Sequence, residues 1–262
     1  MNMKMPESTS PQINRDIELL LCGYADYGLT EFIYPEYLEH KDEIGTDCIL
    51  RLAEHLAECG IKDNEYTVQS IRMASARLFN SSQEPSKELF KLAFPRPFES
   101  EISKNCRNYN LSEYLLYGLI RSESFFNAEV NSRAGAVGLT QLMPETAKDV
   151  AGKLKLKDYD IEDSATNIKF GTFYIEELKR RLDDSEIMAL FAYNGGISRI
   201  RRWEKITKQQ LKRNDVPHDI LLESLPYSET REYGRKVSSA AAIYGWLYYK
   251  KCACDVIEEI MN

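Results

Sequence analysis

The 262-residue sequence has few of the features that mark membrane, nucleic-acid-binding or metal-binding proteins. No window approaches the roughly 18 consecutive apolar residues that a membrane-spanning helix needs, so we predict no membrane span. The net charge is −7, and no Lys/Arg cluster is interleaved with aromatic residues, which argues against nucleic acid as a partner. The sequence carries no signal for a particular oligomeric state.

Histidine is scarce and cysteine is scattered. The three histidines are isolated, and although His55 lies four residues before Cys59, no second pair of ligands accompanies them. Cys252 and Cys254 are too close for the usual two-residue spacing of a zinc pair. The six cysteines form no disulfide framework in a chain of this size. We therefore predict no metal site and no cofactor.

Helical patterns fill most of the remaining chain, and no alternating stretch predicts a convincing strand. Residues 1–11 are polar, carry two prolines and are predicted to be a disordered lead. Amphipathic helices follow, including a segment near Phe32 to Leu38 that Pro35 should interrupt, and a helix that Gly60 should end. Phe94 to Phe98 contains two prolines and makes the best boundary. We predict an all-α protein with an irregular helical module at 12–97 and a second domain at 98–262.

The stretch from Leu115 to Gln141 is the most informative part of the second domain. If Ser112 caps a helix that continues to about Phe126, then Leu115, Leu119 and Glu123 share one face. Burial beside core residues raises the pKa of a carboxyl group, as a general acid near neutral pH requires. By itself such a Glu is more often paired with an Arg or a backbone donor. A glycine-containing loop at 131–138 and a helix beginning at Pro144 should follow.

Four short motifs occur in order along this domain. They are Glu123-Ser124, then Gly138-Leu139-Thr140-Gln141, then Ala192-Tyr193-Asn194, and finally the run from Leu225 to Tyr233. In order and spacing they resemble the soluble lytic transglycosylases of glycoside hydrolase family 23, in the goose-lysozyme-like superfamily. The resemblance covers roughly residues 110–250. It implies a lysozyme-like α domain, in which the 131–141 loop could hold a small β-ribbon, preceded by the last part of a helical scaffold.

The resemblance implies a peptidoglycan lytic transglycosylase that acts on glycan strands. Such enzymes cleave the MurNAc-β-1,4-GlcNAc bond with a single Glu, here Glu123, which acts as acid and then as base and leaves a 1,6-anhydro ring. Hydrolysis usually takes two carboxylates. The acidic residues that follow the loop lie in a charged stretch that we interpret as solvated surface: Asp149, Asp158, Asp160 and Glu162.

The resemblance also implies roles for other residues at the site. Gln141 and Ser132 match positions that bind the sugar or its N-acetyl group, and Tyr193 matches a phenol near the acid. Met143 lines the cleft in the family, although a core Met before a helix is an equal alternative. Glu229 either lines the site or is a charge favoured at a helix N-terminus. The full set of predicted substrate-binding residues is Ser132, Gln141, Met143, Tyr193, Asn194, Glu229 and Tyr233.

Two positions depart from the family pattern. Thr140 stands where the family usually has Met, so the cleft beside the acid is expected to be reshaped. Gly195 in place of Ala is a smaller change. Two other functions stay open: a goose-type lysozyme that hydrolyses the same bond, and a catalytically silent peptidoglycan-binding scaffold.

Two further observations concern charge and location. The basic run Arg199, Arg201, Arg202 and Lys205 is either a solvated helix face or a local anion-binding site. The N-terminus has no apolar core after its single Lys and does not read as a signal peptide. Because a cell-wall substrate implies a periplasmic or cell-envelope location, we expect the chain to be a processed or truncated form.

Overall fold

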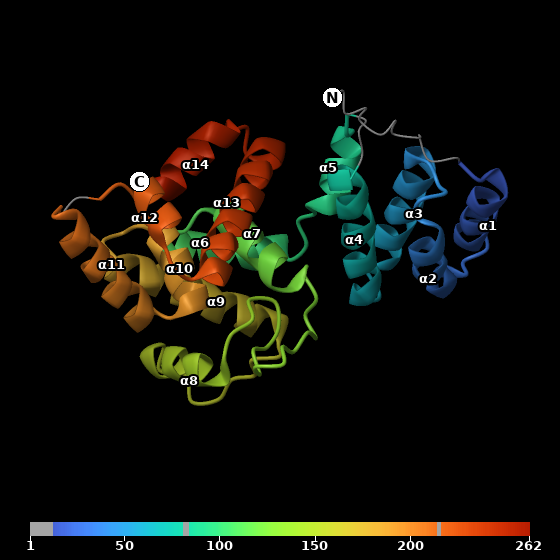
Figure 1. Ribbon diagram of the computed structural model, residues 1–262. Helices are drawn as coiled ribbons and strands as arrows, with labels where there is room; N and C mark the ends of the chain where they lie inside the picture. Colours follow the sequence, from blue (N-terminus) through green and yellow to red (C-terminus); the bar gives the residue numbers. More distant parts are fainter. Residues whose placement is uncertain (1–12, 81–83, 214–215) are drawn as a thin grey trace, which may run out of the picture. The chain divides into compact units, whose positions relative to one another are not determined.

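A computed structural model describes residues 13–80, 84–213 and 216–262 of the protein, so the predicted disordered lead at 1–11 lies outside the described residues. The fold is all-α, as predicted (Figure 1). No strand forms in the described ranges, and the predicted β-ribbon is reduced to two isolated bridges, Asn131 with Val137 and Val137 with Leu142. The chain divides into two compact units between Pro95 and Arg96, and each is described by itself.

The first unit is a series of short helices whose apolar faces pack on one another. The helix α3 packs against α1, α2, α4 and α5, so its buried residues Leu52, Ala53 and Leu56 form the centre of this unit. The helices of the unit are α1 (Arg15–Asp26), α2 (Thr30–His40), α3 (Thr46–Cys59), α4 (Asn64–Asn80) and α5 (Lys87–Ala93).

Two predictions for this unit need correction. Pro35 does not interrupt the second helix, because α2 runs through it with Ile33 and Tyr37 buried on either side. Gly60 does follow the end of α3, but its φ of −60° is right-handed, so the end does not depend on left-handed backbone. The position requires a glycine for another reason: a Cβ there would lie 2.2 Å from Oγ1 of Thr67.

The second unit is built around two long-range neighbours, α7 (Glu113–Ser124) and α13 (Ser228–Tyr248). The helix α10 (Glu186–Gly195) packs on α13 and on α9 (Ser164–Arg181), and α6 (Glu99–Tyr109) covers α9 and α7. Pro144 begins a helix as predicted. The remaining helices are α8 (Pro144–Lys153), α11 (Ile197–Leu211), α12 (His218–Ser224) and α14 (Ala253–Met261).

The helices α7 and α13 cross closely at Gly118. A Cβ on this residue would lie 2.9 Å from the carbonyl oxygen of Val237 and 2.9 Å from the backbone nitrogen of Ala241. Only a residue without a side chain allows the two backbones to come this close. The crossing brings the C-terminal part of α7 alongside the N-terminal half of α13, which are more than 100 residues apart in the sequence.

The loop between α7 and α8 is attached to α9 by one buried side chain. The amide of Asn167 donates to the carbonyl oxygens of Val137 and Ile161, and its Oδ1 accepts from the backbone and hydroxyl of Thr140. Thr140 is fully buried against Gly171, where a Cβ would lie 2.5 Å from the threonine methyl group. Gly171 therefore permits this close packing, and the Thr140 side chain faces α9 and the interior.

Candidate active site

Glu123 lies in the last turn of α7, and its side chain is half-buried among the buried residues of that helix. Burial of its carboxyl group raises the pKa to about 7, against the opposing effects of a hydrogen bond from Tyr233 and the charge of Lys236. The rise predicted from the apolar helix face is thus present. Near neutral pH both the protonated and the ionised form of this group are populated, so it can give and take a proton.

Tyr233, on α13, holds this carboxyl group in place. Its hydroxyl donates to Oε1 of Glu123 over 2.6 Å, across 110 positions of sequence. Burial, followed by the charge of Glu123, raises the pKa of Tyr233 well above 10, so the phenol stays a donor. Within the described part of the chain Oε2 of Glu123 has no hydrogen-bond partner. The geometry therefore fixes one carboxyl oxygen and leaves the other to carry a proton.

Two hydrogen bonds fix the loop beside the acid. The hydroxyl of Ser124 donates to the carbonyl oxygen of Leu139 over 2.9 Å, and Tyr193 on α10 donates to that of Thr140 over 2.7 Å. Tyr193 therefore bonds to the loop, and the bond that orients Glu123 comes from Tyr233. Burial, and next the charge of Glu123, raises the pKa of Tyr193 well above 10. The charge of Glu123 thus raises the pKa of both tyrosines.

Gln141 and Ser132 shape this loop from within. Gln141 has a left-handed backbone with φ of 49°, and its amide donates to the carbonyl oxygens of Val130 and Gly138. Oγ of Ser132 accepts from the backbone nitrogen of Ala136 over 2.9 Å. Both side chains hold the loop in the absence of a sugar, and their predicted role in sugar binding stays a prediction.

The remaining predicted residues lie around the same region. Met143 precedes α8 with 42% of its surface exposed, which excludes the alternative of a core methionine. Oδ1 of Asn194 accepts from Oγ1 of Thr230 over 2.8 Å and so ties the end of α10 to α13. Glu229 is exposed in the first turn of α13, four positions before Tyr233, and both interpretations of it stay open.

No second acid joins Glu123 from the charged stretch after the loop. Asp149 is exposed and pairs with Lys153, and Asp160 accepts from the backbone of Glu162. Asp158 and Glu162 are exposed as well. These four carboxylates lie on solvated surface, as the sequence indicated.

Three residues that position the site were missed by sequence reasoning. Gly118 permits the helix crossing, Asn167 attaches the loop, and Lys236 donates to the carbonyl oxygen of Ser122 over 2.9 Å beside the acid. A glycine in mid-helix, together with the alanines at 240–242 of the partner helix, was the one available signal. Asn167 and Lys236 carry no signal in a single sequence.

In the first unit, the described residues contain one group of side chains that could approach a cation. Ligand atoms of Glu36, Glu39 and His40 lie within 4.8 Å of one another. His40 is bonded to Glu43 over 2.9 Å, and hydrogen bonding to that carboxylate raises its pKa. The group is a partly exposed ion-pair cluster on α2, and no other observation points to a metal there.

Residues 100–216 match the family model described as the transglycosylase SLT domain. The chain is 32% identical over 155 residues to the soluble lytic murein transglycosylase of Salmonella typhimurium, and 31% identical over 156 residues to the membrane-bound lytic murein transglycosylase C of Shigella sonnei. These alignments cover 58% and 53% of this chain, and 23% and 44% of the two relatives. The chain thus spans about a quarter of the soluble relative it matches.

Solved structures share the fold. The lytic transglycosylase Slt of Pseudomonas aeruginosa, in an inactive mutant, superposes with a TM-score of 0.67 at 21% identity, over 97% of this chain and 39% of that one. The 70-kDa soluble lytic transglycosylase of Escherichia coli superposes with a TM-score of 0.66 at 20% identity, over 94% and 39%. Among the described residues no helix has the length and apolar character to cross a membrane.

Proposed function

We propose that the protein is a peptidoglycan lytic transglycosylase and that Glu123 is its single catalytic acid and base. The observation that carries the proposal is a half-buried carboxyl group with a pKa of about 7, held through one oxygen by Tyr233. The match of residues 100–216 to the transglycosylase SLT domain supports the same activity, as do relatives that are named lytic murein transglycosylases.

The proposed reaction uses the two protonation states of one group. Oε2 of Glu123 gives its proton to the glycosidic oxygen between MurNAc and GlcNAc as the bond to the anomeric carbon breaks. The carboxylate that results accepts the proton of the muramyl 6-hydroxyl group, whose oxygen bonds to the anomeric carbon and closes the 1,6-anhydro ring. The enzyme returns to its protonated state without a net loss or gain of protons.

One carboxylate suffices because the nucleophile belongs to the substrate. An internal hydroxyl group already has a high effective concentration, so no bound water has to be activated. The substrate's acetamido group can stabilise the positive anomeric centre, which a second carboxylate would otherwise do. This mechanism needs no second catalytic carboxylate from the protein. It is consistent with the exposed positions of Asp149, Asp158, Asp160 and Glu162.

Mass spectrometry of the soluble products from purified sacculi tests the proposal. A transglycosylase releases 1,6-anhydro products, which are lighter by one water than the reducing products of a goose-type lysozyme. Glu123→Gln should abolish release while the circular dichroism spectrum is kept. Reducing products would favour the lysozyme, and no product from the wild type would favour a silent scaffold that binds peptidoglycan. Substantial activity in Glu123→Gln would overturn the assignment of the acid.

The other site residues belong to the same proposal. Ser132, Gln141, Met143 and Tyr193 would contact the glycan along the loop and α10, with Asn194, Glu229 and Tyr233 on the side of α13. A substrate of this kind implies work in the periplasm or cell envelope, which is where we propose that the protein acts.

A further inference from the structure

The last turn of α7, which carries the candidate acid, ends abruptly. Phe125 and Phe126 have left-handed backbones with φ of 51° and 64°, so the helix cannot continue past Ser124. In a continued helix the backbone nitrogen of Phe126 would donate to the carbonyl oxygen of Ser122. It donates to Oγ of Ser124 instead, over 3.1 Å. The carbonyl group that precedes Glu123 therefore lacks its helical donor.

Lys236 on α13 supplies a hydrogen bond at this place. Its Nζ donates to the carbonyl oxygen of Ser122 over 2.9 Å, across 114 positions of sequence. A cation is also favoured at the C-terminal end of a helix, where the unpaired carbonyl groups carry partial negative charge. Lys236 thus caps the end of α7 from a neighbouring helix.

The ring of Phe125 holds the ammonium group near this carbonyl. Nζ of Lys236 lies 5.5 Å from the centre of the ring, and the guanidinium of the buried Arg121 lies 5.3 Å from the same centre. Cations at this distance are attracted to the face of an aromatic ring. The left-handed turn that removes the backbone donor of α7 therefore also presents the ring that keeps its replacement in place.

Lys236 and Tyr233 attach the last turn of α7 at two points. They lie three positions apart on α13 and so share one face of that helix. Tyr233 donates to Oε1 of Glu123 over 2.6 Å, and Lys236 donates to the carbonyl of the preceding residue, Ser122. A single bond would allow the turn to pivot, whereas bonds to two adjacent residues also fix its rotation. The acid is thus oriented through the backbone as well as through one of its own oxygens.

Lys236 also acts on the acid through its charge. Burial raises the pKa of Glu123, and the charge of Lys236 opposes this rise. Burial and then the charge of Arg121 lower the pKa of Lys236, and the charge of Glu123 opposes them. The tyrosines at the acid, Tyr233 on α13 and Tyr193 on α10, have a pKa well above 10 and stay neutral. Lys236 is thus a cation that favours the carboxylate form of the acid.

We propose that Lys236 is a positioning residue for the reaction: it replaces the absent backbone donor at Ser122 and, together with Tyr233, holds the last turn of α7 with its acid in place. The inference rests on the proposed function and adds a residue that lies outside the four sequence motifs. The nearby cation also stabilises the carboxylate that forms when Glu123 gives its proton to the glycosidic oxygen, and so assists the first step.

The pH–rate profiles of two variants test the proposal. Lys236→Met keeps an aliphatic side chain but removes the donor and the charge, so kcat should fall about tenfold, with a smaller change in KM. The descending limb of the profile should move to higher pH, because Glu123 keeps its proton longer without the opposing charge. Lys236→Arg keeps a donor and the charge and should restore both kcat and the position of the limb.

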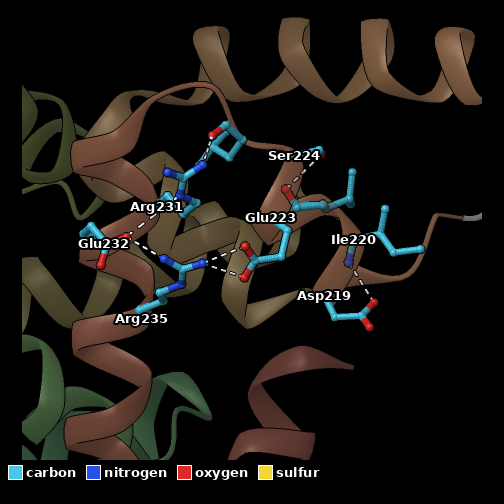
Figure 2. Close-up of polar contacts among 9 residues, drawn as sticks. Asp219, Ile220, Glu223, Ser224, Arg231, Glu232 and Arg235 are labelled. Carbon is cyan, nitrogen blue, oxygen red and sulfur yellow. Dashed lines mark hydrogen bonds and ion pairs between the residues drawn. The ribbon is translucent and has the colours of Figure 1, made fainter. Parts of the chain in front are cut away.

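Arg235→Met is the matched control, because it removes one positive charge from the adjacent position of α13. Figure 2 shows that Arg235 is turned toward Glu223 and Glu232, and it donates to both carboxylates. These ion pairs are largely exposed, so their loss should cost little stability, and the profile should keep the wild-type position. An unchanged kcat and limb in Lys236→Met, or an equal change in Arg235→Met, would overturn the proposal.

A titration without substrate separates this inference from the proposed function. Nuclear magnetic resonance of protein with carboxyl-labelled glutamate measures the pKa of Glu123, whose signal is identified by its loss in Glu123→Gln. This pKa should be higher in Lys236→Met than in the wild type and unchanged in Arg235→Met. That result, with a wild type that releases no anhydro products, would overturn the proposed function alone. Anhydro products, with the same Glu123 pKa in all three proteins, would overturn the role of Lys236 alone.

Discussion

The chemical properties of the candidate site depend on how one carboxyl group is surrounded. Glu123 is flanked by two half-buried tyrosines, yet only Tyr233 donates to it. Tyr193 gives its hydrogen to the backbone of Thr140, which leaves the acid with one fixed oxygen. The pKa of about 7 is therefore a balance in which burial outweighs a hydrogen bond and the charge of Lys236. Each contribution can be removed separately.

Removing the ionisable group should stabilise the fold above neutral pH. The folded-state pKa of Glu123 is about 7, and that of a free Glu is about 4.3. The folded state therefore holds this proton more strongly, and stability falls as pH rises between these values. In Glu123→Gln the unfolding free energy at about pH 8 should exceed that of the wild type by up to about 4 kcal/mol, at roughly 1.36 kcal/mol per pKa unit.

Urea unfolding as a function of pH measures this difference, which should disappear below about pH 4, where Glu123 is protonated in both states. The measurement does not depend on activity. A variant less stable than the wild type at about pH 8 would show that the ionised carboxylate of Glu123 does not destabilise the folded state.

Tyr233→Phe should move the pH dependence of activity toward higher pH. The bond from Tyr233 lowers the pKa of Glu123, so its loss should raise that pKa above about 7 and shift the descending limb of the pH–rate profile upward. The maximal rate should fall because the carboxyl group is no longer oriented.

Tyr249→Phe is the matched control for that variant. It removes a 2.7 Å bond to the carboxylate of Glu113 between the other ends of the same two helices. Its profile should keep the wild-type position. A shift of equal size in both variants would mean that the packing of α7 on α13, and not the bond to Glu123, sets the pKa.

At the level of elements, the periodicity of apolar residues predicted most of the helices. The helices α9 and α13 each bury one side, whereas α7 is buried around nearly its whole circumference. The periodicity gave no bounds for α11 and α12, because their buried residues are few and Ile206 and Ile220 are exposed. Family motifs indicated Glu123 and Tyr233 separately. The bond between them could not be predicted, because it depends on a helix crossing that no local pattern encodes.

Gly118→Val should disturb the site more than it disturbs the fold. A side chain at this crossing must push apart the backbones at Val237 and Ala241, and overpacking of this kind costs about 1–3 kcal/mol. Because Glu123 and Tyr233 lie on the two separated helices, activity should fall by a larger factor than stability alone explains. Thermal unfolding and product release measured on the same sample check this.

The control is Gly152→Ala in the exposed last turn of α8, where nothing lies within 4 Å of the added Cβ. This change should keep full activity and add up to about 1 kcal/mol of stability, since Ala favours helix over Gly. If Gly118→Val left activity unchanged, the close crossing would have no part in placing the acid.

On the scale of the whole molecule, the two units have separate cores, and every residue proposed for catalysis belongs to the second. The division of function between 12–97 and 98–262 stays a prediction of the sequence. The chain covers 39% of the solved structure from Pseudomonas aeruginosa.

The separation of cores gives a direct expectation for a fragment of residues 96–262. It should fold alone, with a helical circular dichroism spectrum and cooperative unfolding, and should release the same products from sacculi as the whole chain. A fragment that aggregates or unfolds without cooperativity would show that the first unit is needed for the second to fold.

The crossing at Gly118 also has a consequence for the timing of synthesis. The acid is made early, but the phenol that orients it emerges from the ribosome 110 residues later. A nascent chain that ends before α13 has a carboxyl group in open solvent, with the acidity of any other glutamate. The proposed acid would thus be assembled in an inert form and become competent only when the last long helix docks.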